Sequence, residues 1–275
     1  MDSASRMLRS RGLRAKGSWG QNFLDDPSAL QRIAEAAELA AGDAVIELGA
    51  GLGHLTCCLV ATGAQVTAVE RDPDLLQVLE ELRADNLRVV CANAAHLSFA
   101  EVAGKKPVIV VGNIPFQLTS PILFELLDQR ADVSRAVLTV QKEVADRLTA
   151  DPGGRDYGIL SVLLGLHFEV RALFDLSPGL FHPPPKVSST VVRLDLLERP
   201  RAPVIDEERF RRLVKAAFAR RRKQISNSLK SDPSLGAPAT MAQALRRAHI
   251  EHSRRAETLS VEEFATLERA LEGPG

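Results

Sequence analysis

The sequence has no long hydrophobic run and few cysteines, and these absences exclude several classes of protein. No apolar stretch in its 275 residues is long enough to cross a bilayer. The first 20 residues contain arginines without an apolar core, unlike a secretory signal. The three cysteines, Cys57, Cys58 and Cys91, lack CxxC spacing, and vicinal cysteines are poor disulfide partners. We therefore expect a cytoplasmic protein with reduced thiols and no membrane contact.

A metal site is not expected either. The six histidines are scattered along the chain. His249 and His252 are spaced so that they could share a helix face, but no third ligand is near them in sequence. We interpret both as surface residues.

The chain also has no excess of charge, since 35 lysines and arginines balance 35 acidic residues. The cations are nevertheless concentrated at two places. Residues 1–20 contain five cations and one aspartate, and residues 209–230 contain nine cations and no acid. A solvated helix face is the ordinary explanation of such runs, but two patches of this kind suit contact with nucleic-acid phosphates. The residues predicted to contact the nucleic acid are Arg11, Arg14, Lys16, Arg220, Arg221, Arg222 and Lys223.

The hydrophobic pattern alternates between strands and helices over most of the chain. Strands are predicted at 44–48, 65–70, 87–91, 108–111, 135–140, 169–176 and 188–196, and helices at 27–41, 55–62, 73–84, 121–129 and 141–150. This alternation predicts an α/β fold with a parallel sheet covered on both faces. The segment 198–203 breaks the pattern, and only helices follow, at 207–219, 241–248 and 261–271. We therefore predict a first domain at 1–203 and a small all-helical domain at 204–275.

A glycine-rich turn, Glu47 to His54, follows the first predicted strand. Its glycines let the backbone approach a ligand closely, and the next helix presents a positive N-terminus. The spacing is GxGxG preceded by an acid, without the GxGxxG of a dinucleotide site. This pattern suits a ligand with a carboxylate and an amine but no pyrophosphate. Glu70 ends the second strand, where a carboxylate can accept both hydroxyls of a ribose.

The segment Asn113-Ile114-Pro115-Phe116 follows the fourth strand and is the most informative in the chain. The Asn113 side chain and the carbonyl of Ile114 are two hydrogen-bond acceptors, and Pro115 has no N–H to compete for them. Phe116 adds a flat stacking surface. Together with the glycine turn and Glu70, in this order, the segment predicts a methyltransferase that uses S-adenosylmethionine (SAM) and modifies an amino nitrogen.

Six segments of the chain are similar to motifs of one family. They are KGSWGQNFLDD, ELGAGLGHLT, NIPFQLTSP, FHPPPKVSSTVV, AFARRRKQISNSLK and RAETLSVEEFATL. On these motifs the chain resembles, over nearly its whole length, the ribosomal RNA adenine dimethyltransferases of the KsgA (RsmA) type. The resemblance implies a Rossmann-like SAM-dependent methyltransferase domain followed by a small helical domain. It also implies dimethylation of two adjacent adenosines near the 3′ end of small-subunit (16S) ribosomal RNA, with the immature 30S subunit as partner. We expect a monomer.

The resemblance also implies the site residues. Phe116 and Phe181 match the aromatics that sandwich the flipped adenine, and Asn113 with the Ile114 carbonyl matches the group that meets the target amine. The residues that match the family's cofactor site are Gln21, Asn22, Leu24, Glu47, Gly49, Gly51, Glu70, Asn93, Ala94 and Asn113.

One position departs from the family pattern. Asn93 stands where the family usually has an aspartate that contacts the adenine amino group of SAM. An asparagine accepts that hydrogen bond without charge, and the difference is on the order of 1 kcal/mol, or about fivefold in affinity. The sequence therefore predicts that Asn93→Asp binds SAM more tightly.

Two other functions remain open at this stage. A resistance-type methyltransferase acting on large-subunit RNA shares the core motifs, although the tail RAETLSVEEFATL favours the small-subunit branch. A non-catalytic assembly or transcription factor can keep the same fold, although the intact glycine turn, Glu70 and Asn113 oppose that interpretation. A DNA adenine methyltransferase is disfavoured, because no target-recognition domain is evident.

Overall fold

A computed structural model describes residues 2–220 and 222–272, and its contacts form two compact units. The first unit comprises Met1–Ala145 and Arg171–Leu196, and the second comprises Asp146–Val170 and Leu197–Gly275. The segment 146–170, which we assigned to the first domain, therefore groups with the C-terminal helices. The reason is its helix α8 (Ile159–Gly165), whose buried apolar residues pack against α9 (Glu207–Phe218) and α12 (Val261–Ala270). No helix of the described chain is both long and apolar enough to span a membrane.

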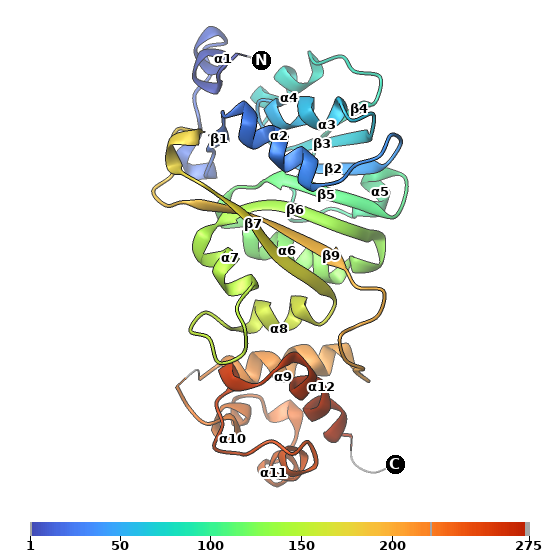
Figure 1. The fold of residues 1–275 in the computed structure, drawn as a ribbon, viewed down its shortest axis with the longest axis vertical. Helices are drawn as coiled ribbons and strands as arrows, with labels where there is room; N and C mark the ends of the chain where they lie inside the picture. The colour runs from blue at the N-terminus through green and yellow to red at the C-terminus, as the bar shows by residue number, and fades with distance from the viewer. Residues whose placement is uncertain (1, 221, 273–275) are drawn as a thin grey trace. The chain divides into compact units, whose positions relative to one another are not determined.

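The first unit is built on a seven-stranded sheet in the order β4-β3-β2-β5-β6-β9-β7 (Figure 1). The strands are β2 (Ala44–Leu48), β3 (Gln65–Glu70), β4 (Leu87–Cys91), β5 (Val108–Asn113), β6 (Val133–Gln141), β7 (Phe168–Leu176) and β9 (Ser189–Leu196). The first five pair in parallel, and β9 is antiparallel to β6. Every residue of β2 is buried, as a strand covered on both faces requires. The predicted Rossmann-like α/β fold is confirmed.

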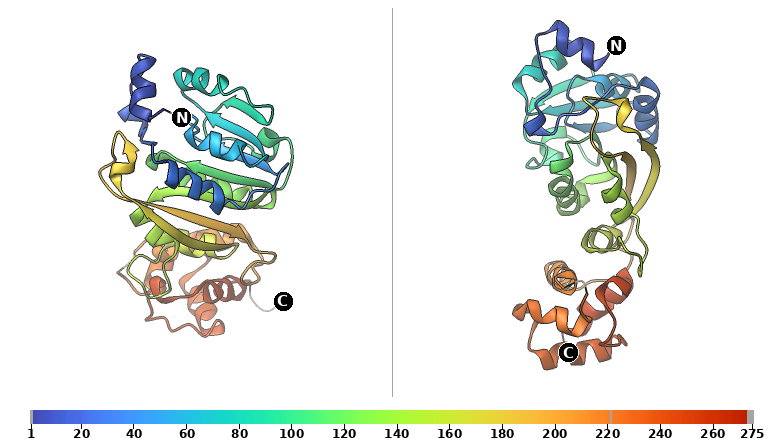
Figure 2. Two further views of the ribbon diagram at one scale, coloured as in Figure 1. Left: turned by 45° about the horizontal axis from the view of Figure 1, so that its top comes forward. Right: turned by 90° about the vertical axis from the view of Figure 1, so that its left-hand side faces the viewer.

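Helices cover both faces of this sheet. They are α2 (Pro27–Ala36), α3 (His54–Val60), α4 (Pro73–Glu80), α5 (Phe99–Ala103) and α6 (Thr119–Asp128). Figure 2 (right) shows α2 on one face and the green helix α6 on the other. The side chain of Asp26 caps α2 by accepting a hydrogen bond from Ala29 N, with Pro27 in the first turn. The helix ends five residues earlier than predicted, because Glu38 turns left-handed with φ 48°.

Several short elements have no periodic signature and were not predicted. They include α1 (Ala4–Ser10), α5, α8 and the two-residue strands β1 (Phe23–Leu24) and β8 (Phe181–His182). β1 and β8 pair antiparallel, with Leu24 opposite Phe181. This pairing joins segments nearly 160 residues apart and brings the N-terminal segment against the proline-rich motif.

The order of strands determines where a ligand can bind. From β2 the chain adds β3 and β4 on one side, and later adds β5 and β6 on the other. In open α/β sheets, ligands bind at the carboxyl ends of the strands where this order reverses. The glycine turn, Glu70 and Asn113 follow or end the three central strands β2, β3 and β5. The topology therefore places all three predicted motifs at one edge of the sheet.

Gly112 precedes the Asn113 motif in β5, and its lack of a side chain is a packing requirement. A Cβ atom there would lie 2.7 Å from the backbone oxygen of Leu48 and 3.0 Å from Cγ2 of Ile114. We predict that Gly112→Ala lowers the free energy of unfolding by about 1–3 kcal/mol, because a backbone oxygen in a parallel sheet cannot move aside. Denaturant unfolding measures this. Gly179→Ala is the control, since nothing lies within 4 Å of its added Cβ and no change is expected there.

The second unit is helical. Besides α8 it contains α9, α10 (Ile225–Ser228), α11 (Pro238–Arg247) and α12. The three predicted C-terminal helices are confirmed, with ends shifted by a few residues. Glu268 on α12 is fully buried and joins the helices at their ends. It accepts hydrogen bonds from the backbone N–H groups of Ile205 and Asp206 and from the guanidinium of Arg209.

Candidate functional site

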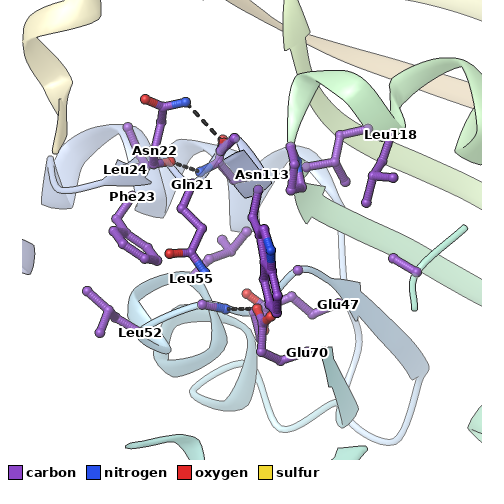
Figure 3. A pocket seen from close by; sticks show the side chains of 18 of the residues that line it. Gln21, Asn22, Phe23, Leu24, Glu47, Leu52, Leu55, Glu70, Asn113 and Leu118 are labelled. Carbon is purple, nitrogen blue, oxygen red and sulfur yellow. Dashed lines mark hydrogen bonds between the residues drawn. The ribbon is translucent and has the colours of Figure 1, made fainter. Parts of the chain in front are cut away.

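A pocket of about 910 Å³, including the open solvent at its mouth, lies at the carboxyl ends of β2, β3 and β5. Figure 3 shows Asn22 and Asn113 at one side of it and the carboxylates of Glu47 and Glu70 at the other. The predicted site residues that line the pocket are Gln21, Asn22, Leu24, Glu47, Gly49, Gly51, Glu70, Ala94, Asn113, Ile114, Phe116 and Phe181. Of the predicted cofactor and catalytic residues, Asn93 alone is not among the lining residues.

The glycine turn follows a path that other residues adopt with difficulty. Gly49, Gly51 and Gly53 have φ values of 75°, 59° and 82°, in the left-handed region. A Cβ at Gly53 would also lie 2.9 Å from a methyl carbon of Leu82. This path carries the N–H of Gly51 to Glu70, to which it donates a hydrogen bond of 2.9 Å.

Glu70 is buried and accepts three backbone hydrogen bonds. Oε2 accepts from Gly51 N, and Oε1 accepts from Arg71 N at 2.8 Å and Asp72 N at 2.9 Å. A carboxylate has about four acceptor positions, so about one remains. The sequence predicts that Glu70 accepts both hydroxyls of a ribose. In this conformation it can accept one, and a second hydrogen bond requires that a backbone N–H be given up.

Glu47 lies beneath the glycine turn and is 1% exposed. Burial raises its pKa to about 8, with a smaller contribution from the nearby charge of Glu70. A hydrogen bond of 2.6 Å that Thr56 donates to its Oε2 opposes this shift. At neutral pH Glu47 is therefore mostly protonated. It presents a neutral carboxylic acid to the pocket.

Asn113 is oriented by the N-terminal segment. Its amide nitrogen donates a hydrogen bond of 3.1 Å to the backbone oxygen of Asn22. Because the nitrogen is committed, Oδ1 is left as the acceptor. Neither Asn113 Oδ1 nor the carbonyl of Ile114 accepts a hydrogen bond within the described chain. The pocket wall thus contains two adjacent, unused acceptors, which match the two N–H donors of an amino group.

The two predicted aromatic walls differ in exposure. Phe116, in the short 3₁₀ helix η2 (Phe116–Leu118), is half-buried and can offer a ring face. Phe181 is only 4% exposed and packs in the core with Leu24 and Ile33. The pairing of β1 with β8 carries Phe181 into this core. Phe181 still forms part of the pocket wall, as does Phe116, and their stacking on an adenine remains a prediction.

The side chains of Gln21 and Asn22 hold the N-terminal segment in place. Gln21 accepts a hydrogen bond from Lys16 N at 2.7 Å and donates one to Asp72 at 2.8 Å. The amide of Asn22 donates to the backbone oxygen of Gly20. Both residues line the pocket, but their amide nitrogens donate hydrogen bonds to other groups of the protein. A direct contact with the methionine end of SAM, implied by the resemblance, remains a prediction.

The predicted RNA-binding residues fall into two groups. Lys16 forms ion pairs with Asp72 at 2.6 Å and Asp74 at 2.8 Å, and Arg11 forms a two-pronged pair with Glu81. These two cations are already neutralised, because α4 brings acids beside the N-terminal segment. The exposed predicted cations without a carboxylate partner in the described chain are Arg14, Arg220, Arg222 and Lys223. Arg221 lies outside the described residues.

Asn93 lies in the turn after β4, where its Oδ1 accepts a hydrogen bond of 3.2 Å from Ala95 N. Its neighbours Ala92 and Ala94 line the pocket. The amide oxygen of an asparagine has two acceptor positions, so one remains after this hydrogen bond. The prediction that Asn93→Asp tightens SAM binding by about fivefold is unchanged. Titration calorimetry tests it, and equal or weaker binding would show that position 93 does not contact the cofactor.

Several lining residues had not been singled out from the sequence. They include Trp19, Phe23, Leu52, His54, Leu55, Arg71 and Ala92. Trp19 lies within the motif KGSWGQNFLDD, and Arg71 follows Glu70 directly, so each was adjacent to a residue that was identified. In residues 2–220 and 222–272 no group of three histidine, cysteine or acidic residues could hold a metal ion.

The chain is similar to known proteins over nearly its full length. The family model "Ribosomal RNA adenine dimethylase" matches residues 12–272. A "Ribosomal RNA small subunit methyltransferase A" of Myxococcus xanthus is 58% identical over 100% of this chain and 96% of its own length. Its counterpart in Geobacter sulfurreducens is 43% identical over 98% and 99%.

Two solved structures are also similar to the chain. A dimethyladenosine transferase from Plasmodium falciparum is 25% identical with a TM-score of 0.77, covering 89% of this chain and 95% of its own. The 23S rRNA methyltransferase ErmE is 30% identical with a TM-score of 0.72, covering 91% and 100%.

Proposed function

The chain belongs to the ribosomal RNA adenine dimethylase family, and on that premise we propose its reaction and substrate. It transfers methyl groups from SAM to the N6 amino nitrogen of two adjacent adenosines near the 3′ end of 16S ribosomal RNA. The observation that carries this proposal is the pair of unused acceptors at Asn113 Oδ1 and the Ile114 carbonyl, in the wall of a pocket that also contains Glu70.

The residues present fit SAM as the cofactor. Glu70 has one acceptor position left for a ribose hydroxyl, and the backbone at Gly49 and Gly51 presents no side chain to an approaching ligand. Ala92 and Ala94 leave room beside Glu70 for a flat ring. Glu47 is an uncharged donor beneath the turn at neutral pH. When bound, SAM supplies an electrophilic methyl group on a sulfonium, so the protein need not supply a nucleophile.

The contribution of this chain is orientation. The amino lone pair of adenine is delocalised into the ring, and two acceptors at Asn113 and Ile114 favour the pyramidal geometry in which the nitrogen attacks. They also stabilise the positive charge that develops there. Alignment of reacting groups can supply about 7–11 kcal/mol of the barrier. No general base is required, because the ammonium product is acidic enough to lose its proton to water.

The target base must leave its stack to reach this pocket. Leaving the stack costs free energy, and stacking of the base on the half-buried ring of Phe116 can offset about 1–3 kcal/mol of it. Phe181 lines the same pocket, although only 4% of its surface is exposed. Transfer of a second methyl requires the same pocket to accept the monomethylated base.

The relatives support the small-subunit RNA as substrate. Those with 43–58% identity over nearly the full chain carry the small-subunit name, whereas ErmE is 30% identical. We further propose that the immature 30S subunit is the partner, that the protein acts as a monomer in the cytoplasm, and that a helical domain near 204–275 contacts RNA. The exposed cations Arg220, Arg222 and Lys223 support that contact, which should depend strongly on salt.

Radiolabelled methyl transfer tests the proposal. Immature small subunits, naked 16S RNA and large subunits are each incubated with the protein and labelled SAM, and mass spectrometry then locates the modified nucleotides. Two adjacent dimethyladenosines near the 3′ end of the small-subunit RNA are expected. Methylation of the large subunit alone would assign the protein to the resistance type, and no transfer to any RNA would identify a binding protein.

A further inference from the structure

Trp19 and Arg71 form a cation–π pair in the pocket wall that neither the fold nor the proposed chemistry uses. The guanidinium carbon of Arg71 lies 4.2 Å from the centre of the Trp19 ring, and both residues line the pocket. Both are also partly exposed, so the pair lies where the pocket meets solvent. We propose that Arg71, held by Trp19, binds a backbone phosphate of the RNA at the nucleotide whose base enters the pocket. This inference rests on the proposed function.

The first argument is charge. Of the described residues that line the pocket, Arg71 is the one arginine or lysine. No carboxylate within the described chain forms an ion pair with its guanidinium, which lies instead over the Trp19 ring. Lys16 also lies over this ring, at 4.9 Å, but Asp72 and Asp74 neutralise it. Arg71 therefore keeps its donors available for an anion from outside the protein.

The second argument is position. Trp19 is followed by Gly20, where an added Cβ atom would lie 3.7 Å from Pro115 and 3.8 Å from Gln117. The Trp19 turn thus adjoins the loop that contains Asn113 and Phe116. On its other side, Arg71 is anchored by its backbone N–H, which donates to Glu70 Oε1. The pair therefore lies between the loop that meets the base and the acid that meets the cofactor.

The third argument is the shape of the substrate. When a base enters the pocket toward Asn113, its ribose and phosphates stay at the rim, where Arg71 lies. A guanidinium suits a phosphate because its planar fork can donate two parallel hydrogen bonds. The Trp19 ring limits the rotation of the guanidinium and stabilises its charge when water is displaced. SAM also has a carboxylate that a guanidinium could bind, and the experiment separates the two anions.

The test compares Arg71→Gln with the wild-type enzyme, using immature small subunits and SAM. We expect the KM for RNA to rise roughly tenfold, the scale of one charge-assisted hydrogen bond. The slope of log affinity against log salt should fall by about one. The dissociation constant of SAM, measured by calorimetry without RNA, should change less than about twofold. Arg71→Lys should recover part of the RNA affinity, since it restores charge without the fork.

Trp19 supplies a second readout because it is the only tryptophan in the chain. Its fluorescence should change when RNA is added to protein already saturated with S-adenosylhomocysteine. Trp19→Leu should raise the KM for RNA, and the double variant with Arg71→Gln should lose little more than either single one. Arg88→Gln, which changes an exposed arginine on β4 outside the pocket, is the matched control.

Two results would overturn the proposal. Weaker SAM binding with an unchanged KM for RNA would assign Arg71 to the cofactor carboxylate. An unchanged KM and salt slope in an active Arg71→Gln enzyme would remove Arg71 from substrate binding. Failure of the wild-type protein to methylate any RNA would instead contradict the proposed function, so the two failures are distinguishable.

Discussion

Replacing Asn113 with alanine is expected to lower kcat by roughly a hundred- to a thousandfold, the loss typical when one preorganised polar group of a reaction centre is removed. The SAM dissociation constant should change less than about threefold, because Glu70 and the glycine turn are untouched. The reason is that Asn113 Oδ1 has no other partner within the described chain and is held by the hydrogen bond from its amide nitrogen to Asn22 O. Single-turnover methyl transfer and calorimetry measure the two quantities.

The matched control removes an amide elsewhere in the same unit. Gln31→Ala changes an exposed side chain on α2 whose contact is with Glu35. It should leave both quantities unchanged. Near-normal turnover in a folded Asn113→Ala enzyme would show that the Ile114 carbonyl alone orients the amine. The pair of acceptors at Asn113 and Ile114 would then no longer support the proposed function.

The second large effect concerns Glu47 and the dependence of stability on pH. Its pKa is raised to about 8 in the folded protein, whereas an unfolded glutamate has its ordinary value of 4.5. Between these values the folded state binds more protons than the unfolded state, so stability falls as pH rises. The contribution is fully present below pH 4.5 and is lost as pH rises through about 8. The slope is at most about 1.4 kcal/mol per pH unit.

Glu47→Gln mimics the protonated acid and should remove this slope. We therefore expect the variant to gain stability relative to wild type between about pH 5.5 and pH 8, by about 1–3 kcal/mol in total. Urea unfolding at several pH values measures the difference. Glu35→Gln, an exposed acid on α2, is the control and should show no such trend. A difference between Glu47→Gln and wild type that stays constant with pH would mean that Glu47 is charged throughout this range.

The helices and strands that could be predicted from the sequence have a hydrophobic pattern that extends over the whole element. The strands at 44–48, 65–70 and 87–91 were predicted to the residue, because continuous apolar runs between turn residues leave little choice of register. The motifs at Glu47 to His54 and at Asn113 to Phe116 follow such strands directly, so their position at one sheet edge follows from parallel pairing. Helix ends were less accurate, since residues such as Glu38 leave the helix without a glycine signal.

The features that could not be predicted depend on contacts between distant segments. Phe181 is predicted to stack on the target adenine, and the sequence gives no sign that a two-residue strand pairs it with Leu24 and leaves it 4% exposed. Lys16 is predicted to bind RNA, and the sequence gives no sign that Asp72 and Asp74 lie beside it in the fold. Neither partner is near in sequence, and a two-residue strand has no period to recognise.

The amino-acid sequence by itself determined the class of fold, the family and the order of the motifs around the pocket, because these are written in local runs and short motifs. The tertiary structure alone decided which side chains are available for chemistry. In the folded protein the amide of Asn113 donates a hydrogen bond to Asn22, three backbone N–H groups donate to Glu70, and burial keeps a proton on Glu47. Arg71 has no counter-ion in the described chain. Availability depends on burial and on the neighbours that folding brings within a few ångströms, and no local pattern contains that information.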